Sequence, residues 1–165
     1  MNKVLLVIDM QEVCVGEEHA KQFKYDKSIV AKVNEVIAAN ENIVYVRNLM
    51  KKNFINLFAS VKVFDGEKEA ELAKNLLKKG SVVFGKYKGD AFSNPQLLDY
   101  LRRNKFDTVE VVGVDGGGCV ALTALGALDN GFRVIVNTKA IGTMFTRKRD
   151  SYYKQLEKRG AIILS

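Results

Sequence analysis

The sequence is poor in the residues from which metal sites and disulfide frameworks are built. Its 165 residues contain two cysteines, Cys14 and Cys119, and a single histidine, His19. These three side chains do not make up a typical four-ligand structural zinc site, and the cysteines are too far apart for a redox Cys-x-x-Cys motif. The only proline, Pro95, follows Asn94 in a pattern typical of a helix start, with Asn94 as the cap.

Long apolar runs are also missing. No run approaches the roughly 18 residues that a membrane span needs. The apolar run at residues 4–8 is short and ends at Asp9, and no small-residue cleavage site follows it. It therefore indicates a buried strand rather than a signal peptide, and we expect a cytoplasmic protein with no membrane partner.

The charge is unbalanced, with a formal net charge of +7 at pH 7. The densest basic group consists of Arg147, Lys148, Arg149, Lys154, Lys158 and Arg159. Asp150 and Glu157 interrupt it, and the helical spacing favours a solvated face. No RNA-binding aromatic signature accompanies it, so we expect no specific nucleic-acid partner and only weak, salt-dependent association.

Strand-like and helix-like segments alternate along the chain. The expected strands cover residues 4–8, 42–46, 81–84, 108–112, 133–136 and 161–164, and the expected helices cover residues 28–39, 67–79, 95–101, 121–129 and 147–158. Repeated β-α-β units predict a three-layer α/β/α fold with a mostly parallel central sheet. No internal repeat or linker divides the chain, so we expect a single domain over residues 1–165.

The ends of the expected strands carry the candidate site. In open parallel sheets, ligands bind at the carboxyl ends of the strands. Asp9 follows the first strand, Lys86 follows the third, and Asp115 to Cys119 follow the fourth. The loop after Val136 reaches the same edge. These residues are therefore expected to lie close together.

Cys119 lies where a strand turns into a helix, and there the backbone N–H groups and the helix dipole favour a thiolate. An isolated cysteine is more often a buried small residue than a nucleophile. Asp9 and Lys86 at the same edge of the sheet favour a nucleophile instead. Asp9, with its pKa raised by burial, can accept the thiol proton, and Lys86 can stabilise the thiolate.

Each assignment has a plainer alternative. Asp9 can merely cap a loop, and Lys86 can be a surface lysine like Lys88 two residues later. Cys14 is interpreted as an ordinary thiol. The glycines before Cys119 match neither the dinucleotide fingerprint nor a P-loop, because the spacing from Gly113 is wrong and no Lys-Ser/Thr pair follows.

Three motifs resemble those of the isochorismatase-like cysteine hydrolases, and the resemblance covers nearly the whole chain. The first strand ends in Val7-Ile8-Asp9-Met10-Gln11. The lysine motif stands as Val83-Phe84-Gly85-Lys86, followed by Ala91-Phe92. The nucleophile motif runs from Gly113-Val114 to Cys119-Val120 and leads into a helix of small residues.

The resemblance implies a role for each matching residue. Cys119 would be the nucleophile, Asp9 the general base and Lys86 the thiolate stabiliser. A cis peptide bond would join Val114 and Asp115, and the backbone amides of Asp115 and Cys119 would form the oxyanion hole. The implied candidates for the substrate pocket are Gln11, Phe92, Val114, Gly116, Gly117 and Gly118, with a core position the alternative for Phe92.

The chain departs from the family pattern at three places. Nicotinamidase-type members bind a metal through an Asp-x-His segment and a second histidine, whereas the corresponding stretch after the second strand here, Val46-Arg47-Asn48-Leu49-Met50, has no histidine. Lys139-Ala140 stands where the family has Asp-Ala, and Gly116-Gly117-Gly118 precedes the cysteine. These glycines would leave the pocket wall without side chains. We therefore expect neither a metal nor another cofactor.

The sequence thus predicts a metal-independent cysteine hydrolase that acts on a small amide or related C–N compound through a thioester. The alternatives are an isochorismate-type vinyl-ether hydrolase and a non-catalytic small-molecule binder on the same fold. The resemblance also implies a homodimer or higher homo-oligomer.

Overall fold

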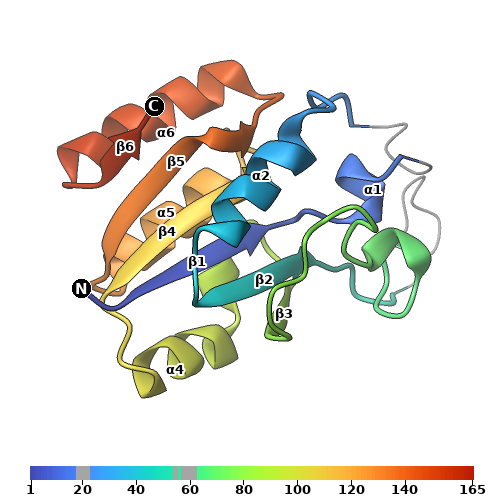
Figure 1. Cartoon of the computed structure of the whole chain (residues 1–165), viewed down its shortest axis with the longest axis horizontal. Coiled ribbons are helices and arrows are strands. Elements are labelled where there is room, and N and C mark those ends of the chain that lie inside the picture. Colours follow the sequence, from blue (N-terminus) through green and yellow to red (C-terminus); the bar gives the residue numbers. More distant parts are fainter. Residues whose placement is uncertain (18–22, 54–55, 57–62) are drawn as a thin grey trace.

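The computed structural model describes residues 1–17, 23–53, 56 and 63–165, and His19 lies outside them. The strands are β1 (Lys3–Ile8), β2 (Ile43–Asn48), β3 (Val83–Lys86), β4 (Thr108–Val114), β5 (Arg133–Gly142) and β6 (Ile162–Leu164). The α-helices of the described residues are α1 (Glu12–Val15), α2 (Ile29–Ala38), α4 (Pro95–Arg103), α5 (Cys119–Asp129) and α6 (Thr146–Lys158) (Figure 1). Short 3-10 helices cover Lys68–Ala70 (η1) and Ala91–Ser93 (η2). No helix in this part of the chain has the length and apolar character needed to cross a membrane.

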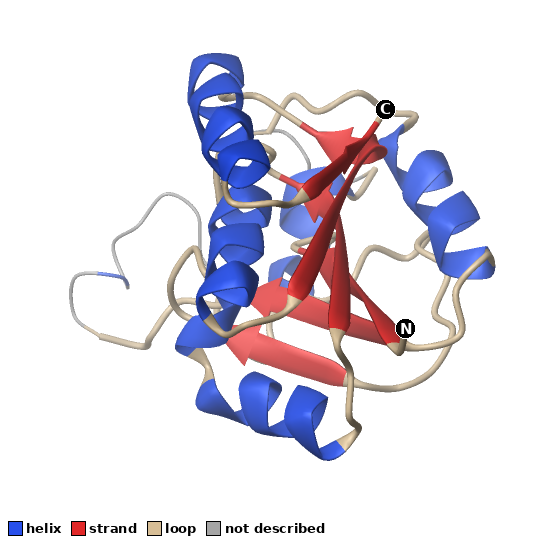
Figure 2. Ribbon diagram, turned by 90° about the vertical axis from the view of Figure 1, so that its left-hand side faces the viewer, coloured by secondary structure: helices blue, strands red, loops and turns tan. Residues whose placement is uncertain are grey.

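The six strands form one sheet in the order β3-β2-β1-β4-β5-β6, and every neighbouring pair is parallel. The predicted α/β fold with a mostly parallel sheet is therefore confirmed. Helices cover both faces of the twisted sheet, as Figure 2 shows from the side. Since all strands run in the same direction, their carboxyl ends meet at one edge.

The alternation of side chains along β1 builds two cores, one on each face of the sheet. Leu5 and Val7 pack with α2 on one face. Val4, Leu6 and Ile8 pack with α4, α5 and α6 on the other face. All five side chains are fully buried, as a central parallel strand requires.

The helix start predicted at Pro95 is confirmed. The Asn94 side chain accepts a hydrogen bond from the Gln96 amide at 3.0 Å, and Pro95 is the first helical residue. The same Asn94 side chain donates to the Gly85 carbonyl at 2.8 Å. The cap thereby ties the start of α4 to β3, directly beside Lys86.

The helix predicted over residues 67–79 is wrong, because only η1 forms there. Beyond the single turn of η1, the backbone of this segment pairs with the segment after β1 and does not continue as a helix. The Glu12 amide donates to Glu71, the Ala73 amide donates to Met10, and Leu72 forms an antiparallel bridge with Gln11. The apolar residues that suggested a helix are still buried, because Leu72, Ala73 and Leu76 pack into the core on the α2 face.

Gly113 allows β4 to pass close to β1 at the carboxyl edge. Its φ is +113°, and it pairs with Ile8 in the sheet. A Cβ at this position would collide with the Ile8 carbonyl oxygen and lie 2.8 Å from the Ile8 amide nitrogen. Only glycine has both the backbone freedom and the small size that this approach requires.

We expect Gly113→Ala to lower the free energy of unfolding by more than about 3 kcal/mol, because it combines a positive φ with a backbone collision. Gly131→Ala is the matched control, since Gly131 has φ +84° but no heavy atom within 4 Å of the added Cβ. The control should cost only about 1–2 kcal/mol. Urea denaturation of the two variants checks the difference, and equal losses would contradict the packing argument.

Candidate active site

The Lys86 side chain joins the three residues that the sequence singled out. Its ammonium nitrogen lies 3.0 Å from Asp9 Oδ2 and 3.2 Å from Cys119 Sγ. A third acceptor, Asn48 Oδ1, lies at 3.1 Å. Lys86 is only 1% exposed, whereas Lys88 is exposed, so the lysine at the site is Lys86.

Each of these side chains lies at the carboxyl edge because a strand ends there. Lys86 is the last residue of β3, Asp9 follows β1, and Cys119 begins α5 after the β4 loop. Asp9 has φ 53°, in the left-handed region that aspartate tolerates better than most residues. This conformation ends β1 and sets the direction of its side chain. The sheet therefore brings Lys86 into contact with Asp9, which lies 77 positions before it, and with Cys119, which lies 33 positions after it.

Burial dominates the electrostatics of the site. It raises the pKa of the Asp9 carboxyl, as predicted, and the Lys86 ammonium offsets part of that rise. Burial and then the Asp9 charge raise the pKa of Cys119 to about 12. Burial alone would lower the pKa of Lys86, but the charges of Asp9 and Cys119 outweigh it and raise that pKa.

These shifts correct one expectation from the sequence. Lys86 does lower the pKa of the Cys119 thiol, but burial and Asp9 outweigh it. Burial and Asp9 therefore favour the thiol form of Cys119, so a base is needed at the moment of attack. Asp9 Oδ1 is buried and accepts no hydrogen bond from the described residues, so this oxygen is free to take a proton.

The loop before Cys119 contains a cis peptide bond and two backbone amides without an acceptor among the described residues. The peptide bond between Val114 and Asp115 is cis, as the resemblance implied. In the described part of the chain, no acceptor binds the backbone amides of Asp115 and Cys119. The Asp115 carboxylate accepts from the Gly117 amide at 2.6 Å and from the Met144 amide at 2.5 Å, which fixes the loop.

The glycine run makes room for protein rather than for a ligand. A Cβ on Gly116 would collide with Thr143 Oγ1 and lie 3.1 Å from the Tyr153 hydroxyl. A Cβ on Gly117 would collide with the Phe145 carbonyl oxygen. The expectation that these two glycines open the pocket wall is therefore wrong, because the segment between β5 and α6 fills that space. At Gly118 an added Cβ would make only an ordinary 3.5 Å contact with Asp115 Cβ.

Three other pocket candidates turn out to be structural. Gln11 is fully buried, and its side-chain amide is bonded to Asn48 and to the Ala70 carbonyl, so it does not face a ligand. Phe92 packs against Phe132 with ring centroids 5.8 Å apart, in the core. The Val114 side chain is buried in the core on the α2 face.

Sequence reasoning missed Asn48 as a member of the site and considered it only as a departure from a metal motif. The feature that could have identified Asn48 is its position at the end of β2, beside the end of β3. The register pairs Asn48 with Lys86 on the same face of the sheet. A complete inventory of strand ends would have found it.

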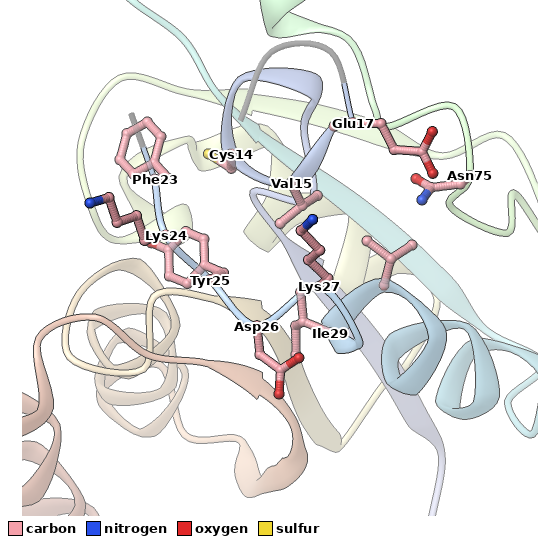
Figure 3. Close-up of a pocket in the computed structure, with 12 residues that line it drawn as sticks. Cys14, Val15, Glu17, Phe23, Lys24, Tyr25, Asp26, Lys27, Ile29 and Asn75 are labelled. Atoms are coloured by element: carbon pink, nitrogen blue, oxygen red, sulfur yellow. The ribbon is translucent and has the colours of Figure 1, made fainter. Parts of the chain in front are cut away.

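A cavity of about 620 Å³ lies between α1 and the start of α2, and none of Asp9, Lys86 and Cys119 is among its lining residues. Figure 3 shows Cys14, Phe23 and Tyr25 on one side of it and Glu17 and Asn75 on the other. Burial raises the pKa of Cys14, and the charges of Asp9 and Cys119 raise it further. The Cys14 thiol is therefore close enough to these two side chains to interact with them electrostatically.

Comparisons with known proteins identify the family. The Isochorismatase domain family matches residues 3–165. The chain belongs to the isochorismatase family. The pyrazinamidase of Pyrococcus horikoshii, solved in complex with zinc, superposes with a TM-score of 0.85 at 24% identity, over 100% of this chain and 99% of that one. This likeness shows the shared fold.

Two relatives match a shorter segment. N-carbamoylsarcosine amidase of an Arthrobacter species is 38% identical over 63 residues, which are 38% of this chain and 24% of that protein. Maleamate amidohydrolase of Pseudomonas putida is 35% identical over 63 residues, which are 38% of this chain and 30% of that protein. The similarity thus covers less than a third of either relative's length.

The described residues of this isochorismatase-family member do not fit a zinc ion of the kind that the pyrazinamidase structure contains. Among them, no group of three or more His, Cys, Asp or Glu side chains could hold a metal ion. Asn48 occupies the edge after β2, and its oxygen is already bound to the Lys86 ammonium. A dication there would meet a cation rather than a set of anionic ligands.

Replacing Lys86 by methionine tests the buried ion pair through stability. Without its cation, ionised Asp9 should cost about 3–5 kcal/mol of unfolding free energy at pH 8. The pKa of folded Asp9 would then lie further above its unfolded value, so the folded state binds the proton more tightly. The loss should therefore shrink as the pH falls to 5.

Urea denaturation of Lys86→Met and of the wild type at both pH values measures this effect. The double variant Asp9→Asn/Lys86→Met is the control, because it has no carboxyl to titrate and should lose the difference between the two pH values. If the single variant loses the same stability at pH 5 and pH 8, Lys86 does not compensate a buried Asp9 charge.

Proposed function

We propose that this isochorismatase-family member is a cysteine hydrolase that cleaves the C–N bond of a small amide through a thioester on Cys119. The observation that carries the proposal is the Lys86 ammonium, which contacts both the Asp9 carboxylate and the Cys119 sulfur. The names of the two partial relatives, both amidases, support an amide as the substrate class.

In the first step, Cys119 sulfur attacks the amide carbonyl carbon as its proton passes to Asp9. An S–C bond forms, and the carbonyl π electrons move onto oxygen. The amides of Asp115 and Cys119, which bind no acceptor among the described residues, donate to that oxyanion in this proposal. Asp9 suits the proton transfer because burial raises its pKa above that of an ordinary carboxyl.

In the second step, the tetrahedral intermediate collapses and the C–N bond breaks. The proton on Asp9 passes to the departing nitrogen, which leaves as an amine or ammonia, and the thioester remains. Water then attacks the thioester carbonyl and gives its proton to Asp9. The C–S bond breaks, the acid is released, and Lys86 stabilises the thiolate until the Asp9 proton returns to it.

No step of this sequence needs a metal, because the donors for the oxyanion and the base for the thiol are residues of the chain. We assign the remainder of the substrate to the cavity lined by Cys14, because the charges of Asp9 and Cys119 act on the Cys14 thiol. The cytoplasmic location, the single-domain organisation and the homo-oligomeric assembly stay predictions.

Cys119→Ala tests the nucleophile. Turnover of a panel of small amides and N-carbamoyl compounds should fall by at least about 1000-fold, because the variant lacks the sulfur that Lys86 contacts and that forms the thioester. Circular dichroism should be unchanged, since Cys119 to alanine removes one partly buried atom. Mass spectrometry of the wild type should find an acyl adduct on the Cys119 peptide. Hydrolysis at the wild-type rate by the variant would overturn the mechanism.

The pH dependence of kcat/KM tests the assignment of Asp9 as base. Activity should fall on the acid side as Asp9 becomes protonated, and this limb should lie above the ordinary aspartate value of about 3.9, because burial raises the pKa. Activity should persist on the alkaline side until Lys86 loses its proton, above its ordinary value of about 10.4. An alkaline increase near pH 8–9 would instead indicate a free thiol with an ordinary pKa.

A further inference from the structure

The Lys86 ammonium makes three contacts at the site, and one of them is with Asn48. An ammonium carries three N–H donors. Asp9 Oδ2, Asn48 Oδ1 and Cys119 Sγ lie at 3.0, 3.1 and 3.2 Å, so each donor has one acceptor. The orientation of the whole group is therefore determined. Removing any one acceptor leaves the ammonium free to shift toward the others.

Asn48 is itself held in place by Gln11. The Gln11 side chain accepts from the Asn48 amide at 2.7 Å and donates to the Asn48 carbonyl at 3.1 Å. Its amide nitrogen also donates to the Ala70 carbonyl at 2.9 Å. Gln11 thus fixes both backbone groups of Asn48, while the pairing of Asn48 with Lys86 fixes its position along the strand.

The neutrality of Asn48 matters as much as its position. Lys86 already faces one carboxylate, Asp9, and must also stabilise sulfur when the thiol proton leaves. A carboxylate at position 48 would compete with sulfur for the same positive charge and would disfavour the thiolate. An amide oxygen accepts the third hydrogen bond without adding negative charge.

We infer that Asn48 is a positioning residue, whose side-chain oxygen directs the Lys86 ammonium toward Cys119 sulfur and whose neutrality reserves the Lys86 charge for that sulfur. Gln11 supports it by holding the Asn48 backbone. This inference rests on the proposed function, in which Cys119 reacts as a thiolate stabilised by Lys86.

Asn48→Asp tests the charge argument with a nearly isosteric change. The rate constant for alkylation of Cys119 by iodoacetamide at pH 8, followed on the Cys119 peptide by mass spectrometry, should fall about tenfold. That factor corresponds to a thiol pKa about one unit higher. Asn42→Asp is the matched control, because Asn42 precedes the amino end of the same strand and its side chain donates to the Lys3 carbonyl, away from Lys86. It should alkylate at the wild-type rate.

Asn48→Leu tests the positional argument without a charge change. It keeps the size of the side chain but removes the acceptor, so Lys86 should shift toward Asp9, its charged partner. Cys119 alkylation should again slow, by at least threefold. Circular dichroism verifies that each variant is folded. If one of the two variants does not fold, the other alone is compared with the wild type.

Alkylation at the wild-type rate in both folded variants, or an acceleration in either, would overturn the role of Asn48. This outcome is separate from failure of the proposed function, because alkylation needs no substrate. If no amide is hydrolysed by the wild type, the proposed function fails even where the alkylation differences are observed. If amides are hydrolysed and alkylation is insensitive to position 48, only the role of Asn48 fails.

Discussion

The site depends on one buried cation that contacts two groups, each of which needs a positive neighbour when it is ionised. Asp9 requires a positive neighbour to remain ionised under burial, and Cys119 requires one when its proton leaves. Lys86 is buried at the end of β3 and contacts both side chains. A buried charge without a partner is costly, so loss of one of the three side chains destabilises the other two. The rest of the fold serves to bring the three strand ends within hydrogen-bonding distance.

Much of this arrangement followed from the sequence because parallel sheets obey a simple rule. Continuous apolar runs identified the strands, and the polar residues just beyond them identified the edge at which ligands bind. Asp9, Lys86 and Cys119 could be selected on that basis, and the structure brings all three together. The cis peptide bond before Asp115 followed only from the family resemblance, since no local pattern requires it.

The failures share a cause, which is that local pattern does not reveal long-range hydrogen bonding. Residues 67–79 have a helical stripe, but their backbone pairs with residues 10–12 instead. Gln11 was expected in the pocket because it belongs to the same motif as Asp9, yet its side chain accepts a hydrogen bond from the Asn48 amide. The glycines at 116 and 117 are adjacent to the nucleophile, but the residues after β5 fill the space beside them. Each of these partners is remote in sequence.

The central claim is that Lys86 offsets the effect of burial on Asp9. Its most direct test is an NMR titration of the Asp9 carboxyl carbon in the wild type and in Lys86→Met. The account predicts a wild-type pKa above the ordinary value of about 3.9 and a further rise in the variant, because the cation that favours the ionised form is gone. An Asp9 that titrates at or below its ordinary value and is indifferent to Lys86 would contradict it.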